Sequence, residues 1–236
     1  MLTAGQSQPK PGQDDLIAQC LCYDWTTILD IGAGSGWVAE RFLKAGRRPF
    51  TTFALLPNQD IPDFGLVLIE RMDKIDSASM DAIWASHVLE HSHNTGLALS
   101  EMHRILQPQG WLFLSVPPFK HAVVGGHVNI GWNLGVLAYV LALHGFDCRR
   151  GAFIRHGYNL AAFVQKAALP DVGLTHGRGD LETLAEYLPQ TYRLVQNSNG
   201  DVDAINWVWR IAPALNAKSL RNQLRRKIGK IAGRFL

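Results

Sequence analysis

A short glycine-rich stretch near the N-terminus constrains the fold of this chain more than any other feature. Residues 27–31 form an apolar run that contains one acid, Asp30, and glycines follow at alternate positions, Gly32, Gly34 and Gly36. Glycine weakens strands and helices, so three within five residues indicate a sharp turn that a ligand approaches closely. We therefore predict a buried strand, a ligand-binding turn and a helix whose free N–H groups attract polar ligand groups. An ordinary strand-to-helix turn is the alternative.

Apolar runs and amphipathic segments alternate along the rest of the chain. Further strands are predicted at residues 49–56, 66–69, 81–85, 111–116, 146–155 and 160–166, and helices at 14–21, 37–45, 95–106 and 133–143. Alternating strands and helices favour a Rossmann-like α/β fold with helices on both faces of a mainly parallel, seven-stranded sheet, here closed by an antiparallel pair. Ligands of such sheets bind at the carboxyl ends of the strands, where Gly32 to Gly36, Glu70 and residues 86–91 are expected to meet.

Composition narrows the class of protein. The chain has 236 residues, of which 47% are hydrophobic and 18% charged, as in a globular domain. Its three cysteines, Cys20, Cys22 and Cys148, fit neither a disulfide framework nor a four-ligand zinc site, which favours reduced thiols in the cytoplasm. The first residues lack the pattern of a signal peptide, and the longest apolar run, 134–143, is too short to cross a bilayer.

Charge is distributed unevenly between the body and the C-terminal tail. Residues 1–203 contain 15 basic and 20 acidic residues, a net charge of −5, whereas residues 204–236 contain eight basic residues and no acid. Residues 217–236 predict a basic amphipathic helix that binds an anionic membrane surface. Packing of its apolar side on the parent domain or on a second subunit is the alternative. The acidic body, without an aromatic and basic platform, argues against nucleic acid as a partner.

The residue after the third glycine bears on the identity of the cofactor. Dinucleotide-binding turns follow G-x-G-x-x-G or G-x-G-x-x-A, where the third small residue lets the helix pack closely on the strand. Trp37 occupies that place here, which disfavours NAD, and no G-x-x-x-x-G-K-[ST] motif supports a P-loop.

Three stretches, residues 28–36, 79–91 and 101–111, resemble the class I S-adenosylmethionine-dependent methyltransferases of the type 11 subgroup in content, order and spacing. The resemblance implies an S-adenosylmethionine-binding core at residues 25–169. An N-terminal extension at 1–24, an irregular accessory segment at 170–216 and the basic tail at 217–236 would surround it.

The same resemblance implies a set of cofactor-binding residues. Asp30 and the turn would hold the methionine end, Glu70 or the turn after it would face the adenine, and Ser86 and His87 would lie beside the methyl group. The full set is Asp30, Gly32, Ala33, Gly34, Gly36, Asn58, Glu70, Arg71, Met72, Ser86 and His87. The second strand ends without the acid that usually binds the ribose hydroxyls. Asn58 is the neutral substitute, with weaker hydrogen bonds than a carboxylate. A methyltransferase-like module that binds without catalysis is therefore the alternative function.

Transfer of an activated methyl group requires mainly alignment, and a hydroxyl acceptor additionally requires a base, most often histidine. His91, His121 and His127 are the catalytic candidates, and His87 is expected to shape the site. Glu90 is either a base or a structural residue. A metal site from these histidines is the alternative, but no i, i+4 ligand pair on a helix supports it, so none is expected.

Residues 117–159 also resemble a narrower group of these methyltransferases, which is associated with bacterial surface-sugar clusters and carries no known substrate. The expected activity is methylation of a small-molecule or glycan-linked acceptor, at oxygen, by a cytoplasmic enzyme. The basic tail would bring this enzyme to the inner membrane face, where lipid-linked glycans are assembled.

Overall fold

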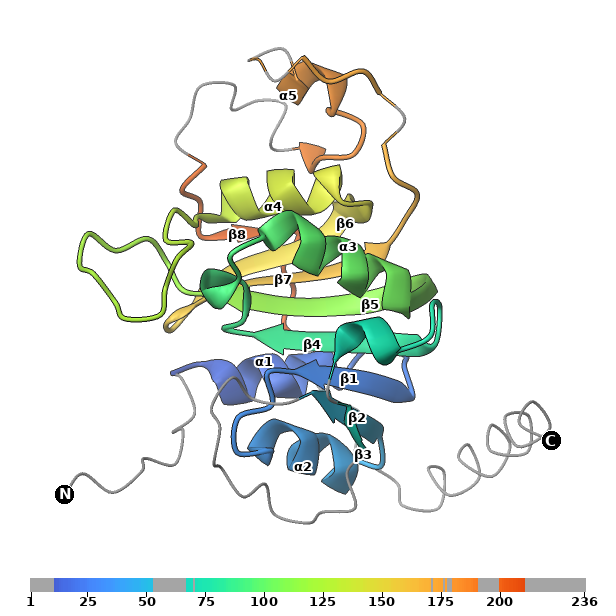
Figure 1. Cartoon of the computed structure of the whole chain (residues 1–236). Helices are drawn as coiled ribbons and strands as arrows, with labels where there is room; N and C mark the ends of the chain where they lie inside the picture. The colour runs from blue at the N-terminus through green and yellow to red at the C-terminus, as the bar shows by residue number, and fades with distance from the viewer. Residues whose placement is uncertain are drawn as a thin grey trace.

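One mixed sheet organises the computed structural model, which describes residues 11–52, 67–69, 71–170, 172–175, 177, 180–190 and 200–210 (Figure 1). The strand order is β3-β2-β1-β4-β5-β7-β6-β8. The strands are β1 (Thr27–Ile31), β2 (Arg48–Thr52), β3 (Val67–Ile69), β4 (Met80–Ser86), β5 (Leu106–Val116), β6 (Phe146–His156), β7 (Asn159–Lys166) and β8 (Ala204–Ile205). β1 to β5 pair in parallel, and β7 lies antiparallel between β5 and β6. The predicted seven-stranded sheet is confirmed, and β8 extends it.

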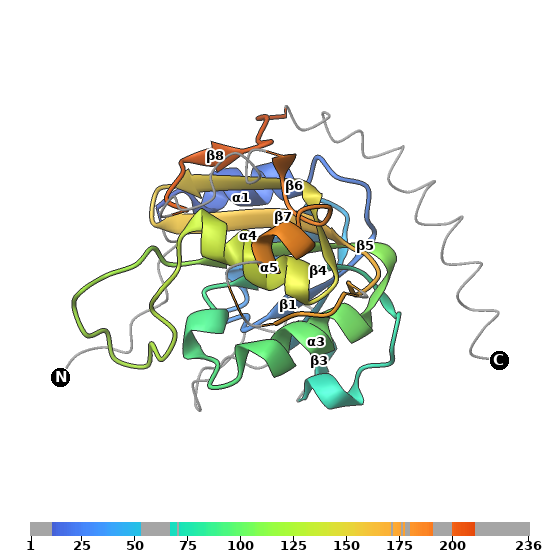
Figure 2. The same cartoon turned by 90° about the horizontal axis from the view of Figure 1, so that it is seen from above.

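Helices cover both faces of this sheet. The α-helices are α1 (Gln13–Cys20), α2 (Trp37–Lys44), α3 (Thr95–Ile105), α4 (Leu134–Leu143) and α5 (Asp180–Thr183), and the 3-10 helices are η1 (Met72–Lys74) and η2 (Leu89–His91). α1 and α2 share one hydrophobic cluster, and α3 and α4 belong to the other (Figure 2). The helices predicted from the hydrophobic periodicity are confirmed.

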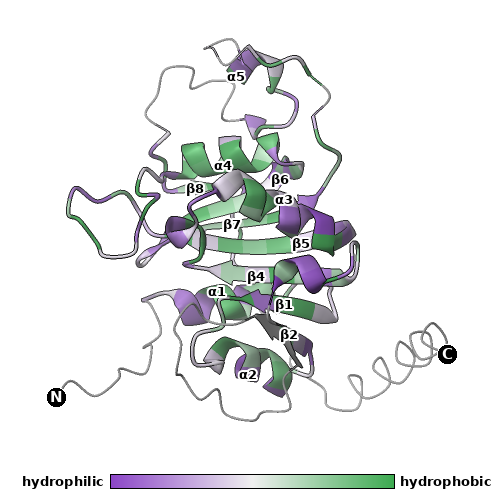
Figure 3. Cartoon of the chain, in the orientation of Figure 1, coloured by the Kyte–Doolittle hydropathy of each residue, from purple (hydrophilic) through white to green (hydrophobic). Residues whose placement is uncertain are grey.

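Alternation along the strands supplies both cores. In β1, Ile28 faces α1 and α2 while Leu29 faces α3 and α4, and both are fully buried. β4 repeats the pattern with Ala82 and Ile83. Each fully buried aliphatic side chain of this size stabilises the fold by about 1.5–3 kcal/mol. The central strands and α4 are accordingly the most hydrophobic parts of the chain (Figure 3).

Asparagine side chains fix the starts of the two helices on the second face. The Asn94 Oδ1 accepts a hydrogen bond from the Leu97 N–H at 2.9 Å, and the Asn133 Oδ1 accepts one from the Val136 N–H at 2.8 Å. Each cap satisfies an N–H group that the helix itself cannot pair. The predicted cap at Asn133 is confirmed.

Two segments differ from the sequence-based expectation. β5 begins at Leu106, directly after α3, instead of at Trp111, because the chain pairs with Met80 of β4 before a register shift. Within the segment expected to be irregular, α5 and the buried side chains of Leu184 and Leu188 join the core beside α4.

Several predicted features lie outside the described residues: the ribose-binding position Asn58, the adenine-binding position Glu70 and the basic helix at 217–236. Within the described ranges, no helix is both long and apolar enough to cross a membrane.

Candidate active site

The turn after β1 has the backbone that its glycines predict. Gly32, Gly34 and Gly36 have φ angles of 71°, 57° and 78°, a region that strains residues with a side chain. A Cβ atom added at Gly32 would lie 3.1 Å from a methyl carbon of Val88, so the turn also packs tightly against the segment after β4. Gly36 begins α2 without a side-chain cap, and Ala33 is buried beneath the turn. The turn therefore presents main-chain groups to a ligand.

Asp30 is buried just before this turn. Its side chain is 2% exposed and accepts a hydrogen bond from the Ala39 N–H, while its Oδ2 has no partner among the described residues. Burial raises the pKa of this carboxyl to about 8. A buried acid with an unpartnered oxygen, beside a turn of open backbone, fits the positively charged methionine end of S-adenosylmethionine.

The turn at the expected adenine position is held by one arginine. The Arg104 guanidinium donates to the carbonyls of Met72 at 3.0 Å and Ile75 at 2.7 Å, and pairs with Glu101 at 2.8 Å. Arg71 is exposed and pairs with its neighbour Asp73 at 2.9 Å. Arg71 and Met72 therefore sit on a braced turn.

A polar chain joins the ends of β4 and β5 to the N-terminal helix. The Ser86 and Ser115 hydroxyl oxygens are 2.8 Å apart, and the Gln13 side-chain amide donates to Ser86 Oγ at 3.0 Å. Gln13 and Ser115 are buried. This places the first residues of α1 over the carboxyl edge of the sheet, beside the expected methyl position at Ser86.

His87 is locked by hydrogen bonds on both ring nitrogens. Its Nδ1 lies 3.0 Å from Glu90 Oε1, and its Nε2 lies 3.0 Å from Asn159 Oδ1. The Asn159 amide donates to the carbonyls of Pro11 and His156, which orients its oxygen towards His87. Nε2 must therefore donate to Asn159. Nδ1 is taken up by the Glu90 carboxyl group, so both ring nitrogens are engaged within the fold and neither is available to a substrate.

The backbone of His87 is also constrained. Its φ angle is 57°, and its N–H donates to the Ser115 carbonyl at 2.9 Å. The Tyr158 ring stacks parallel to the imidazole at 5.7 Å, and the Lys120 Nζ lies 4.3 Å from the centre of the tyrosine ring. This arrangement fits the predicted role of His87, which is to shape the site without moving a proton.

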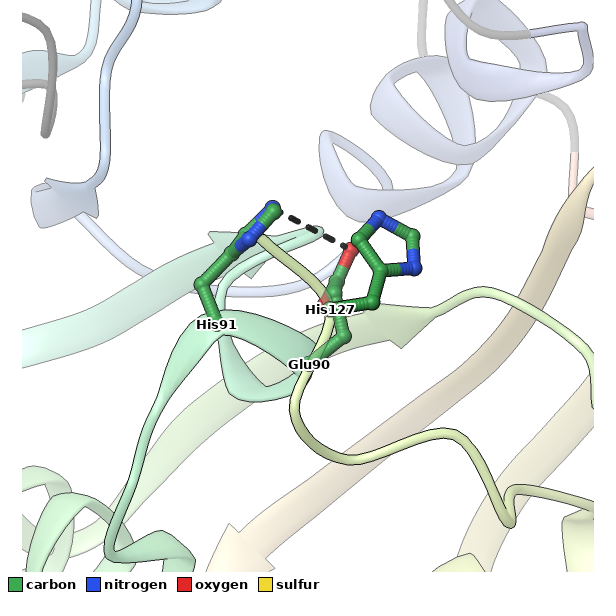
Figure 4. Close-up of side chains that lie close together, drawn as sticks. All are labelled: Glu90, His91 and His127. Carbon is green, nitrogen blue, oxygen red and sulfur yellow. Dashed lines mark ion pairs between the residues drawn. The ribbon is translucent and has the colours of Figure 1, made fainter. Parts of the chain in front are cut away.

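Three further side chains gather next to this pair. Glu90 is fully buried, and the rings of His91 and His127 meet edge to face with their centres 4.9 Å apart (Figure 4). The His91 Nε2 lies 4.0 Å from Glu90 Oε1, and its Nδ1 lies 2.9 Å from the Gly126 carbonyl oxygen. Because a carbonyl only accepts, Nδ1 carries a proton, and in the neutral imidazole the lone pair is then on Nε2.

The loop that brings His127 to this place is fastened by Glu90 itself. The N–H groups of Val128 and Asn129 donate to the Glu90 carbonyl at 2.7 and 3.1 Å, and the Asn129 side-chain amide donates to the Leu89 carbonyl at 3.1 Å. His121 lies apart from this group: it is exposed and contacts Phe119, with the ring centres 4.7 Å apart. The structure thus brings together two of the three predicted catalytic histidines, His91 and His127.

Sequence reasoning assigned no role to four residues of this site: Gln13, Ser115, Tyr158 and Asn159. Tyr158 and Asn159 fall in a stretch that carried a resemblance, but nothing local indicated a contact with His87. The buried Asn159 follows a glycine in a tight β6–β7 turn, and that combination was the available signal. The sequence around Gln13 and Ser115 contains no comparable signal.

Comparisons with known proteins relate the domain and its fold to methyltransferases. Residues 29–114 match the family described as methyltransferase domain. A search of curated protein sequences finds no match. Among solved structures, the 1,6-didemethyltoxoflavin-N1-methyltransferase of Burkholderia thailandensis is similar, with a TM-score of 0.54 and 20% identity over 65% of this chain and 76% of that one. That structure holds 1,6-didemethyltoxoflavin and S-adenosylhomocysteine.

Two other solved structures share the fold with a similar degree of structural similarity. An S-adenosylmethionine-dependent methyltransferase of Aquifex aeolicus has a TM-score of 0.52 and 16% identity over 67% of this chain and 95% of that one. The [4+2]-cyclase SpnF has a TM-score of 0.52 and 15% identity over 66% and 80%. The fold is therefore shared with methyltransferases and with a cyclase.

Proposed function

We propose that this chain, which carries a class I S-adenosylmethionine-dependent methyltransferase domain of type 11, methylates an oxygen atom of a small-molecule or glycan-linked acceptor. The observation that carries the proposal is the state of His91. Its Nδ1 proton is held by the Gly126 carbonyl, its Nε2 is free to accept a proton, and Glu90 lies 4.0 Å from that nitrogen.

The cofactor, when bound, supplies a methyl group on a positively charged sulfur. Asp30 and the glycine turn would hold its methionine end, and the turn braced by Arg104 would face its adenine. A hydroxyl acceptor must lose its proton as its oxygen bonds to the methyl carbon and the methyl–sulfur bond breaks. His91 Nε2 would take that proton, and the nearby Glu90 carboxylate would stabilise the imidazolium that forms.

A His91→Gln variant tests this assignment. For a hydroxyl acceptor we expect kcat to fall by about 10²–10⁴-fold, because the base is lost, while S-adenosylmethionine affinity measured by calorimetry stays unchanged. His121→Gln is the matched control and should keep wild-type activity. For a nitrogen acceptor, as the name of the 1,6-didemethyltoxoflavin-N1-methyltransferase indicates for that protein, a free lone pair needs no such base. Equal rates for His91→Gln and wild type on every active acceptor would refute oxygen transfer through His91.

A non-catalytic binding module is the second candidate. The feature that favours it is the second strand, which lacks the usual ribose-binding acid. Calorimetric titration separates the two candidates, since the enzyme requires S-adenosylmethionine binding. No heat of binding at high micromolar cofactor would rule out the methyltransferase.

The basic segment 217–236 suggests that the protein encounters its acceptor at a membrane surface. Its spacing of apolar and basic residues suits the surface of an anionic membrane, on which lipid-linked glycans are assembled. We expect full-length protein to co-sediment with vesicles that contain anionic lipid, and a form that ends at residue 216 to remain in solution. Equal partitioning of the two forms would exclude this role for the segment.

A further inference from the structure

We infer that Glu90, His91 and His127 form a binding site for one divalent transition-metal ion of the zinc type. Each residue offers one ligand atom, and the three atoms all lie within 4.8 Å of one another (Figure 4). Ligands around zinc in a tetrahedral site are about 3.3 Å apart, given bonds of roughly 2.0–2.1 Å. Small side-chain rotations close the remaining distance.

The protonation pattern of His91 suits a metal ligand. Metal-bound histidines almost always donate their second ring N–H to a carbonyl or carboxylate, which fixes the ring and the tautomer. His91 has this contact already, to the Gly126 carbonyl at 2.9 Å. A Cβ atom at Gly126 would lie 3.3 Å from His91 Nδ1, and Gly126 has a φ of 80°, so glycine permits the close approach.

The main chain places His127 beside the other two ligands before any ion binds. Val128 and Asn129, the next two residues, both donate backbone N–H groups to the Glu90 carbonyl. The ligand-bearing loop is thus bonded to the residue that supplies the third ligand. A site held together in this way loses little conformational entropy on binding.

The burial of Glu90 provides a second, independent observation. Its carboxylate is 0% exposed, and its Oε2 has no hydrogen-bond partner in the part of the chain that the structure describes. Its Oε1 already accepts from His87. A buried carboxylate oxygen without a partner costs free energy, and a cation beside it would remove that cost.

The ligand set and its exposure indicate which ion and what role. Two imidazoles and one carboxylate suit zinc and related first-row ions, and magnesium prefers oxygen ligands only. The His91 side chain is 32% exposed, which leaves room for a solvent or acceptor oxygen at the open coordination positions. With an ion bound, the His91 Nε2 lone pair would be used as a ligand, so the ion would replace His91 as the activating group: an acceptor hydroxyl bound to it would lose its proton more readily. This catalytic role rests on the proposed function, whereas metal binding itself does not.

Cobalt titration of untagged, EDTA-treated protein tests the site. Co²⁺ bound by nitrogen and oxygen gives visible d–d absorption without the near-ultraviolet thiolate band that Cys22 would produce. We expect saturation at one ion per chain, displacement by Zn²⁺, and at least tenfold weaker binding in His91→Gln and His127→Gln. His121→Gln, on the same loop, is the matched control and should bind like wild type.

Circular dichroism and thermal melting establish that each variant is folded. If either His91→Gln or His127→Gln does not fold, the other variant alone serves for the comparison. Absence of the d–d band in wild type, or equal affinity in wild type and both ligand variants, would overturn the proposal. S-adenosylmethionine calorimetry on the metal-free protein reports separately on the methyltransferase. If the protein binds the metal but not the cofactor, the metal site is supported and the proposed function is refuted. If it binds the cofactor but not the metal, the proposed function is retained and the metal site is refuted.

Discussion

Asp30 and Glu90 are both buried carboxyl groups near the ends of neighbouring parallel strands. Asp30 lies in β1, next to its final residue, and Glu90 lies in η2, which follows β4. Each carboxyl group has one oxygen without a hydrogen-bond partner among the described residues. Their surroundings differ. Asp30 accepts a hydrogen bond from the Ala39 N–H, and burial raises its pKa to about 8. Glu90 faces His87 directly and lies near His91.

The difference separates two ways of keeping an acid in a protein interior. Asp30 holds its own proton near neutral pH, so it is stable until a positively charged ligand makes ionisation favourable. Glu90 is hydrogen-bonded to an imidazole that Asn159 orients, so a polar partner for one of its oxygens is built into the fold. The first arrangement suits a binding site for a cationic cofactor, and the second suits a site that must keep a carboxylate available.

Removal of the Glu90 carboxylate should give the largest change in stability. Glu90→Met keeps the size of the side chain but leaves the His87 Nδ1 buried without a partner. We expect the free energy of unfolding, measured with urea, to fall by about 3–5 kcal/mol. Glu90→Gln should cost only about 1 kcal/mol, because a neutral His87 can accept from the new amide. Equal losses in the two variants would show that the charge pair does not support the fold.

Substitution of Asp30 by Asn should raise the free energy of unfolding, in contrast to the Glu90 substitutions, and the increase should depend on pH. A carboxyl whose pKa is raised on folding keeps its full stability below the unfolded pKa of about 3.9 and loses it as the pH rises towards the folded value. The loss is about 1.4 kcal/mol per pH unit. Relative to wild type, Asp30→Asn should therefore gain about 3 kcal/mol between pH 5 and pH 7 and level off above pH 8. Urea unfolding across this range measures it, and a difference independent of pH would contradict a protonated Asp30.

The same titration should appear in cofactor binding. If ionised Asp30 faces the positive groups of S-adenosylmethionine, binding below pH 8 releases a proton. Calorimetry in two buffers with different ionisation enthalpies would detect the release in wild type and its absence in Asp30→Asn. Identical heats in the two buffers would place Asp30 away from the cofactor charge.

The two carboxyl groups also show how far the sequence alone could lead. The Asp30 region is local: the alternation of Ile28 and Leu29 and the three glycines predict strand, turn and helix, and the structure confirms all three. The Glu90 region depends on distant contacts. Asn159 is 72 residues from His87, and Pro11 is 148 residues from Asn159. Periodicity describes one element at a time, so it contains no information on such pairs.

The position of His127 is the clearest case. Sequence reasoning placed His121 and His127 in one glycine-rich loop and had no means to separate them. The separation comes from main-chain bonds of the next two residues to Glu90, which draw His127 inward and leave His121 exposed. The expectation of no metal site rested on the absence of a helical i, i+4 pair, whereas the proposed ligands come from η2 and from this loop.

Substitution of Asn129 should have the smallest effect on stability of these predictions, and a selective effect on metal binding by Glu90, His91 and His127. Its side-chain amide donates to the Leu89 and Ser92 carbonyls, so Asn129→Ala removes two hydrogen bonds, about 1–2 kcal/mol of unfolding free energy. If the side chain positions His127, cobalt affinity should also fall about 10–100-fold, as for other residues that orient metal ligands. Asn133→Ala, which removes the cap of α4 at the far end of the loop, is the matched control with a similar cost in stability. Because both variants weaken the fold to a similar degree, a fall in cobalt affinity in Asn129→Ala alone would show that the loop, and not overall stability, sets the geometry of the cluster. Equal cobalt affinities in the two variants would show that the Asn129 side chain does not set the geometry of the cluster.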